Sequence, residues 1–167
     1  MSETIGKTAL LARIDAARAA WESLLAEVGE ARMLAPGAMG TWSVKDIVAH
    51  LASYEQVLVE LLTCFVGGRP EAFVNPLDAA FNDAQVARRG HMSLDEVRAE
   101  YKNAHRRVTE LIQQTQADQR RQAGLLPWYG PEYDLEDFLV YTYYGHKREH
   151  SAQIAAFADT VRSARQQ

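Results

Sequence analysis

Several features are scarce in this sequence, and each absence narrows the class of protein. Its 167 residues include one cysteine, Cys64, so no disulfide can form within them and a reducing compartment is expected. No apolar run approaches the roughly 20 residues that cross a bilayer. The first residues lack the basic and then apolar segments of a secretory signal. The net charge of −4 argues against general nucleic-acid binding, which typically needs a basic face. We therefore expect a cytoplasmic protein whose partners include neither membrane nor nucleic acid.

Patterns typical of other folds and chemistries are absent too. There is no alternating strand pattern, internal repeat, glycine-rich phosphate-binding loop or nucleophile elbow. The apolar content of 47% and the charged content of 24% are ordinary for a globular protein. A chain of this length can bury a sizeable core. Residues 1–167 are therefore expected to form a single all-α domain.

Four long segments carry apolar residues at intervals of three and four, the pattern of a helix with one buried face. The side chains of Ser43, Ser93 and Asp134 are suited to cap the last three segments. The connection 67–92 is long for a simple reversal, so it can cross the end of a bundle, and residues 78–89 predict a short extra helix within it. The expected fold is a four-helix bundle, with helices over residues 4–28, 44–65, 93–115 and 134–162.

Two histidines lie four residues apart on the last expected helix, His146 and His150. At this spacing both rings lie on one face, one turn apart, and can converge on one metal ion, as in helical zinc motifs. Both fall within the apolar stripe, where an unpaired polar group is costly. The alternative is a pair of core histidines hydrogen-bonded to carbonyls or carboxylates. This stretch alone does not decide between the two interpretations.

Other polar residues lie on or beside the apolar stripes. His50 is at the edge of the stripe of the second helix, and a lone histidine in such a place is usually structural. Glu55 lies within the same stripe, either as a buried ion-pair partner or as a carboxylate that orients a ligand histidine. A helical wheel separates Glu55 from His50. His105 flanks the stripe of the third helix and is expected at its surface or boundary.

Two segments, in this order and at this separation, carry a resemblance to a known family. They are Gly-Thr-Trp-Ser-Val-Lys-Asp-Ile-Val-Ala-His-Leu at residues 40–51 and Gly-His-Lys-Arg-Glu-His-Ser-Ala-Gln-Ile at residues 145–154. Together with the helix spacing, they resemble the DinB/YfiT-like superfamily of four-helix bundles, and the likeness covers most of the chain. The Trp-Ser-Val-Lys-Asp opening of the second helix, Asn82 after Phe81, and Ser-Leu-Asp-Glu at residues 93–96 are similar to its ClbS/DfsB branch.

The resemblance implies a bundle whose second and third helices are joined by a long crossover. It also implies a metal site with one histidine from helix two and a pair from the last helix, which correspond to His50, His146 and His150. The metal is usually nickel or zinc. Three imidazoles leave a position open for water or substrate, as in catalytic sites. Relatives include transferases and isomerases that use low-molecular-weight thiols. Relatives in the ClbS/DfsB branch include self-resistance proteins that act on reactive small molecules, and not all rely on a metal.

The preferred hypothesis is a divalent-metal-dependent enzyme, a hydrolase or thiol transferase, that activates water or a thiol against a small electrophilic molecule. Trp42, Tyr54 and Tyr143 are candidates for the pocket wall. Glu149 either lies behind a ligand histidine or pairs with a nearby cation. One alternative is a metal-free small-molecule-binding or self-resistance protein of the ClbS/DfsB kind, with the histidines as polar pocket residues. Another is a structural helical dimer without catalysis.

The expected assembly is a homodimer. Relatives often form dimers, and the apolar helical surface exceeds what four simple stripes require, notably at Val57, Phe65 and Val140.

Overall fold

The structure, a computed structural model, describes residues 6–164. Within them, four long helical segments account for most of the chain, which confirms the all-α class. The predicted start of the first helix near residue 4 lies outside the described residues. The long segments are α1 (Lys7–Val28), α3 (Val44–Val66), α5 (Leu94–Gln114), and a last segment made of α7 (Leu135–Asp137), η2 (Phe138–Tyr144) and α8 (Gly145–Ala164).

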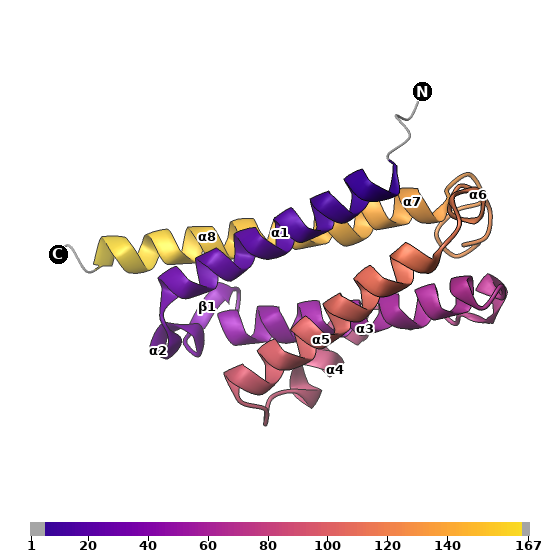
Figure 1. The fold of residues 1–167 in the computed structure, drawn as a ribbon. Helices are drawn as coiled ribbons and strands as arrows, with labels where there is room; N and C mark the ends of the chain where they lie inside the picture. The colour runs from indigo at the N-terminus through magenta and orange to yellow at the C-terminus, as the bar shows by residue number, and fades with distance from the viewer. Residues whose placement is uncertain (1–5, 165–167) are drawn as a thin grey trace.

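These four segments are arranged as two pairs (Figure 1). Helix α1 lies alongside α8 and runs in the same direction. Helix α3 packs against α5, and both run opposite to the first pair. Because α3 and α5 run the same way, the chain between them must return along the bundle. Residues 67–93 make this return and contain η1 (Pro70–Ala72) and α4 (Phe81–Arg88), so the predicted crossover and its short helix are confirmed.

All three predicted caps form, and each is reciprocal. The Ser43 hydroxyl oxygen accepts from the Asp46 N–H at 3.2 Å, while the Asp46 carboxylate accepts from the Ser43 N–H at 2.8 Å. The same arrangement opens α5 at Ser93 and α7 at Asp134. A cap of this kind stabilises a helix by about 1 kcal/mol. The Ser43 cap therefore fixes where α3 begins, ahead of His50.

The connections hold short elements that the sequence analysis did not predict. The expectation of no strand was wrong, because strands of four and two residues are too short to show an alternating pattern. Gly40, in the turn between the two strands, has a φ of 57°, which glycine adopts without strain. The second strand of this hairpin places Trp42 two residues before the start of α3. The unpredicted elements are α2 (Glu30–Met33), the antiparallel strands β1 (Pro36–Met39) and β2 (Trp42–Ser43), and α6 (Ala117–Arg120).

The last helical segment is not α-helical throughout, as the sequence analysis assumed. Its middle part, η2, is a π-helix, in which backbone hydrogen bonds run i→i+5 rather than i→i+4. The wider turn rotates each residue by a smaller angle. A helical wheel drawn at α-helical spacing therefore misplaces the side chains that precede His146. Such π segments are frequent at functional sites, and this one ends directly before the turn that carries His146.

Helix α3 is the central helix of the core. Among the described helices it alone is long and apolar enough to cross a membrane. The sequence analysis did not recognise this apolar segment. Of the apolar window in α3, 67% is buried inside the structure. The apolar character of α3 is therefore explained by packing against its neighbours, because a helix covered on several faces has no need of a polar side.

Two of the three residues that motivated the homodimer lie in the core of the single chain. Phe65 is 0% exposed and Val57 is 9% exposed. Val140 is partly buried against the same cluster. These side chains are therefore not surplus apolar surface, and the homodimer stays a prediction.

Truncating Leu51 or Leu139 to alanine should destabilise the fold by about 2–5 kcal/mol, because each leaves a cavity in a close-packed core. Leu51 is 1% exposed and Leu139 is 0% exposed. Leu34, which is 55% exposed, is the matched control, and Leu34→Ala should cost no more than about 0.5 kcal/mol. Denaturant unfolding measures all three. A loss below about 1 kcal/mol at both buried positions would show that they do not face the core.

Candidate metal centre

Three histidine rings from two helices meet at one point of the bundle. His50 is on α3, and His146 and His150 are on α8. The Nε2 atom of His146 lies 2.8 Å from Nε2 of His50 and 2.9 Å from Nε2 of His150. One nitrogen from each ring lies within 4.8 Å of the other two. His50 and His150 are buried and His146 is half-buried, so the three rings could hold a metal ion.

The two short contacts among these rings cannot both be hydrogen bonds. An imidazole nitrogen carries either one N–H or one lone pair, and it uses that single position for a hydrogen bond. The Nε2 atom of His146 has two Nε2 neighbours within 3 Å, so no more than one of the contacts is a hydrogen bond. A cation at the point of convergence would accept a lone pair from each ring. The donor set therefore fits a metal ion better than it fits a hydrogen-bonded core.

The outer nitrogens of two rings differ in their surroundings. His150 Nδ1 lies 2.7 Å from Gln153 Oε1. An amide oxygen accepts hydrogen bonds, so Nδ1 carries the proton and Nε2 keeps its lone pair. Partners of this kind orient metal ligands, and the sequence analysis did not assign this role to Gln153. His50 Nδ1 is buried and has no hydrogen-bond partner within residues 6–164.

All three imidazoles have depressed pKa values. Burial and the neighbouring His150 lower the pKa of His50 to about 4. Burial, His150, His50 and Lys147 lower the pKa of His146 to about 3. Burial also lowers the pKa of His150, against the raising effects of Gln153 and Glu149. The rings are therefore neutral at pH 7, which is the form that binds a metal.

Two of the predicted wall residues lie against the histidines. The Trp42 ring centre is 5.2 Å from that of His50. The Tyr54 ring centre is 4.7 Å from that of His50 and 4.3 Å from that of His146. The Tyr54 hydroxyl donates a hydrogen bond to Asn82 Oδ1 at 3.1 Å. Asn82 belongs to α4, so the crossover helix takes part in building the surroundings of the histidines.

Tyr143 and Glu149 do not join the histidine cluster. The Tyr143 hydroxyl donates to the Glu55 carboxylate and accepts from Lys147 at 2.8 Å. Tyr143 lies in η2, four residues before Lys147, so its side chain belongs to the polar contacts around Lys147. Glu149 is exposed to solvent. Its negative charge raises the pKa of His150.

A second buried polar cluster surrounds Lys147, which is 1% exposed. Lys147 forms an ion pair with Glu55, which is 0% exposed, so Glu55 is a buried ion-pair partner. Burial opposes ionisation of Glu55, but Lys147 and His105 outweigh it and hold the pKa of Glu55 below its usual value. His105 is 4% exposed and lies 3.1 Å from Lys147 Nζ. The sequence analysis expected His105 at the surface or boundary of its helix. The side chain is instead buried, because it faces Lys147 and Glu55.

The fold and the cluster together define a class: an all-α protein with a long crossover and three histidines that converge from two helices. The chain belongs to the DinB superfamily, whose family model matches residues 13–154. No curated protein and no solved structure is significantly similar to the chain.

Without metal, the stability of the protein should fall as the pH decreases below about 6.5. The pKa of His50 drops from 6.5 to about 4 on folding, so as the pH falls His50 is protonated in the unfolded chain before it is protonated in the folded one. The folding free energy is therefore unaffected by His50 above pH 6.5, and the folded state loses stability progressively as the pH falls toward 4. His50→Gln should flatten the dependence between these values, measured as unfolding free energy against pH in a chelator. The exposed His91→Gln is the control, and equal slopes in the two variants would contradict the prediction.

Proposed function

We propose that the protein is a metal-dependent enzyme that acts on a small electrophilic molecule, as a hydrolase or as a transferase of a low-molecular-weight thiol. The observation that carries the proposal is the convergence of three neutral imidazoles whose Nε2 contacts of 2.8 and 2.9 Å cannot both be hydrogen bonds. Membership of the DinB superfamily supports it.

His50, His146 and His150 would hold one divalent ion through their Nε2 atoms. Imidazole ligands suit nickel and zinc. The ion would act as a Lewis acid that lowers the pKa of a bound water or thiol and so makes it nucleophilic at neutral pH. Three protein ligands leave room for a substrate or a nucleophile, whereas closed structural sites use four. The lone pair of His150 Nε2 stays available because Gln153 holds the ring by its other nitrogen.

The side chains next to the histidines would bind and orient the substrate. The Trp42 and Tyr54 rings offer apolar surface beside the cluster. The Tyr54 hydroxyl gives its proton to Asn82, which leaves the Tyr54 oxygen free to accept a hydrogen bond from a bound molecule.

Two further parts of the proposal rest on the sequence: that the protein belongs to the ClbS/DfsB branch, and that it is cytoplasmic. Asn82 is one of the residues that resemble this branch, and its contact with Tyr54 gives it a place beside the histidines. The single cysteine, Cys64, suits a reducing compartment.

Metal content tests the proposal most simply. Protein prepared without an affinity tag should bind one nickel or zinc ion per chain. Turnover of an activated ester, or of an epoxide together with a thiol, should disappear on chelation and return with the metal. Binding of small molecules that persists unchanged in fully metal-free protein would favour the metal-free alternative. A chain that binds neither metal nor small molecules would favour the structural dimer.

A further inference from the structure

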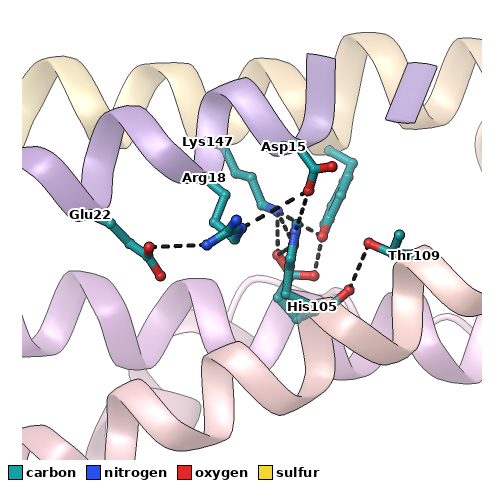
Figure 2. A network of polar contacts seen from close by, with 8 residues as sticks. Asp15, Arg18, Glu22, His105, Thr109 and Lys147 are labelled. Atoms are coloured by element: carbon teal, nitrogen blue, oxygen red, sulfur yellow. Dashed lines mark hydrogen bonds and ion pairs between the residues drawn. The ribbon is translucent and has the colours of Figure 1, made fainter. Parts of the chain in front are cut away.

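A second candidate site lies in a cleft between α1 and α5, lined by none of the three converging histidines. Its volume is about 430 Å³, within the range of small-molecule sites. Figure 2 shows Asp15, Arg18 and Glu22 of α1 facing His105 and Thr109 of α5. The rest of the lining comes from α5: Lys102, Arg106, Glu110 and Gln113.

Behind this cleft, the ammonium of Lys147 fixes the tautomer of His105. An ammonium has three N–H donors and no acceptor. Lys147 Nζ has three neighbours: a Glu55 carboxylate oxygen, the Tyr143 hydroxyl at 2.8 Å and His105 Nδ1 at 3.1 Å. His105 Nδ1 also lies 3.5 Å from a Glu55 carboxylate oxygen, which is too long for a good hydrogen bond. The closer contact is the one with Lys147, so Nδ1 is the acceptor and the neutral ring carries its proton on Nε2.

The resulting N–H donor of His105 is buried and has no hydrogen-bond partner within the described residues. Across the cleft, the nearest Asp15 carboxylate oxygen is 3.5 Å from Nε2 (Figure 2), too far for a good hydrogen bond. The His105 side chain is 5% exposed, so bulk water does not reach it freely. A buried donor without a partner is costly, and an anionic oxygen in the cleft would remove that cost.

Charges of both signs flank this donor. Lys102 and Arg106 lie near His105 on α5 and form no hydrogen bond or ion pair within residues 6–164. On the facing helix, Glu22 accepts from Arg18 at 3.0 Å through one oxygen, while its other oxygen is buried without a partner. The carboxylate of Asp15, which lies nearest the donor, is offset by Arg18 at 4.0 Å. The cleft therefore offers an unpaired donor near two cations without a partner among the described residues, and one unpaired carboxylate oxygen of Glu22 on the opposite wall.

We propose that this cleft binds a small zwitterion of the ω-amino-acid or short-peptide class. Its carboxylate accepts from His105 Nε2 and faces Lys102 and Arg106, and its ammonium donates to the free oxygen of Glu22. Asp15 faces His105, and Glu22 lies two turns further along α1, about 10 Å by helix rise. The site therefore favours a ligand whose charged groups are separated by several bonds over one in which they are adjacent.

A graded set of probes tests both the charges and their separation. The probes are β-alanine, γ-aminobutyrate and ε-aminocaproate, with caproate and hexylamine as single-charge controls. Titrations followed by NMR of the histidine side chains should show saturable binding that shifts His105 Nε2. ε-Aminocaproate should bind more tightly than β-alanine, and each control should bind at least about tenfold more weakly, because one charged hydrogen bond is lost.

Substitutions on the two walls complete the test. Glu22→Gln and Arg106→Ala should each weaken ε-aminocaproate binding by about tenfold or more. Arg13, an exposed cation of α1 that does not line the cleft, is the matched control, and Arg13→Ala should bind normally. Metal binding by the three histidines, measured in parallel, should be unchanged in all three variants. Equal affinity for caproate and ε-aminocaproate, no saturation, or a shift confined to His146 would overturn the proposal.

Discussion

Glu55→Ala should destabilise the fold by about 3–5 kcal/mol, because it leaves a charged group buried without its counter-ion. The Lys147 ammonium is 1% exposed and forms an ion pair with Glu55, which is 0% exposed. The Tyr143 hydroxyl also loses its acceptor when the carboxylate is removed. Since Glu55 is on α3 and Lys147 on α8, the loss should appear as a lower free energy of unfolding of the whole domain, measured in denaturant.

Two further variants separate the charge effect from the loss of side-chain volume. Glu60 is on the same helix but exposed, so Glu60→Ala should cost no more than about 0.5 kcal/mol. Replacing Glu55 by leucine together with Lys147 by methionine should recover part of the stability that Glu55→Ala loses, because an apolar pair of similar volume can replace a buried ion pair. The Tyr143 hydroxyl still lacks its acceptor in this double variant. A Glu55→Ala variant as stable as Glu60→Ala would show that Lys147 does not depend on this carboxylate.

The second large effect concerns metal affinity. His146→Ala and His150→Ala should each abolish stoichiometric binding, and His50→Ala should weaken it strongly, by more than about 100-fold, which exceeds the usual effect of losing an outer partner. The Nε2 of His146 contacts both of the others, so its removal breaks the cluster at its centre. Isothermal titration with nickel and with zinc measures the loss. Circular dichroism should show an intact helical fold, because the core does not depend on these rings.

His91→Ala is the control for these titrations, because His91 is an exposed histidine outside the cluster. It should bind metal like the parent. If the triple variant lacking His50, His146 and His150 bound divalent metal as tightly as the parent, the ligand assignment would be wrong.

The parts of the fold that the sequence predicted are those set by local patterns. The spacing of apolar residues located the long helices, and the side chains of Ser43, Ser93 and Asp134 located three helix starts. The length of the connection after α3 indicated a crossover. The histidine pair on α8 was evident from its spacing, and its link to His50 came from the family resemblance.

The parts that it missed depend on how separate helices are rotated against one another. Lys147 is a charged residue between two ligand candidates, and its burial is visible only once Glu55 and His105 are known to face it from α3 and α5. The same uncertainty led to the expectation that His105 lies at the surface or boundary of α5. The π-helical turn of η2 left no recognisable signal in the sequence. The hydrogen bond of Tyr143 to Glu55 on α3 was not predicted either.

X-ray absorption spectroscopy of the tag-free protein loaded with one equivalent of nickel or zinc tests the central claim most directly, because it reads the atoms bound to the ion. We predict three imidazole nitrogens at about 2.0–2.1 Å from a single ion, and loss of this signature in His146→Ala. A bound ion without imidazole in its shell, or an identical spectrum in the variant that lacks all three histidines, would contradict the proposed centre.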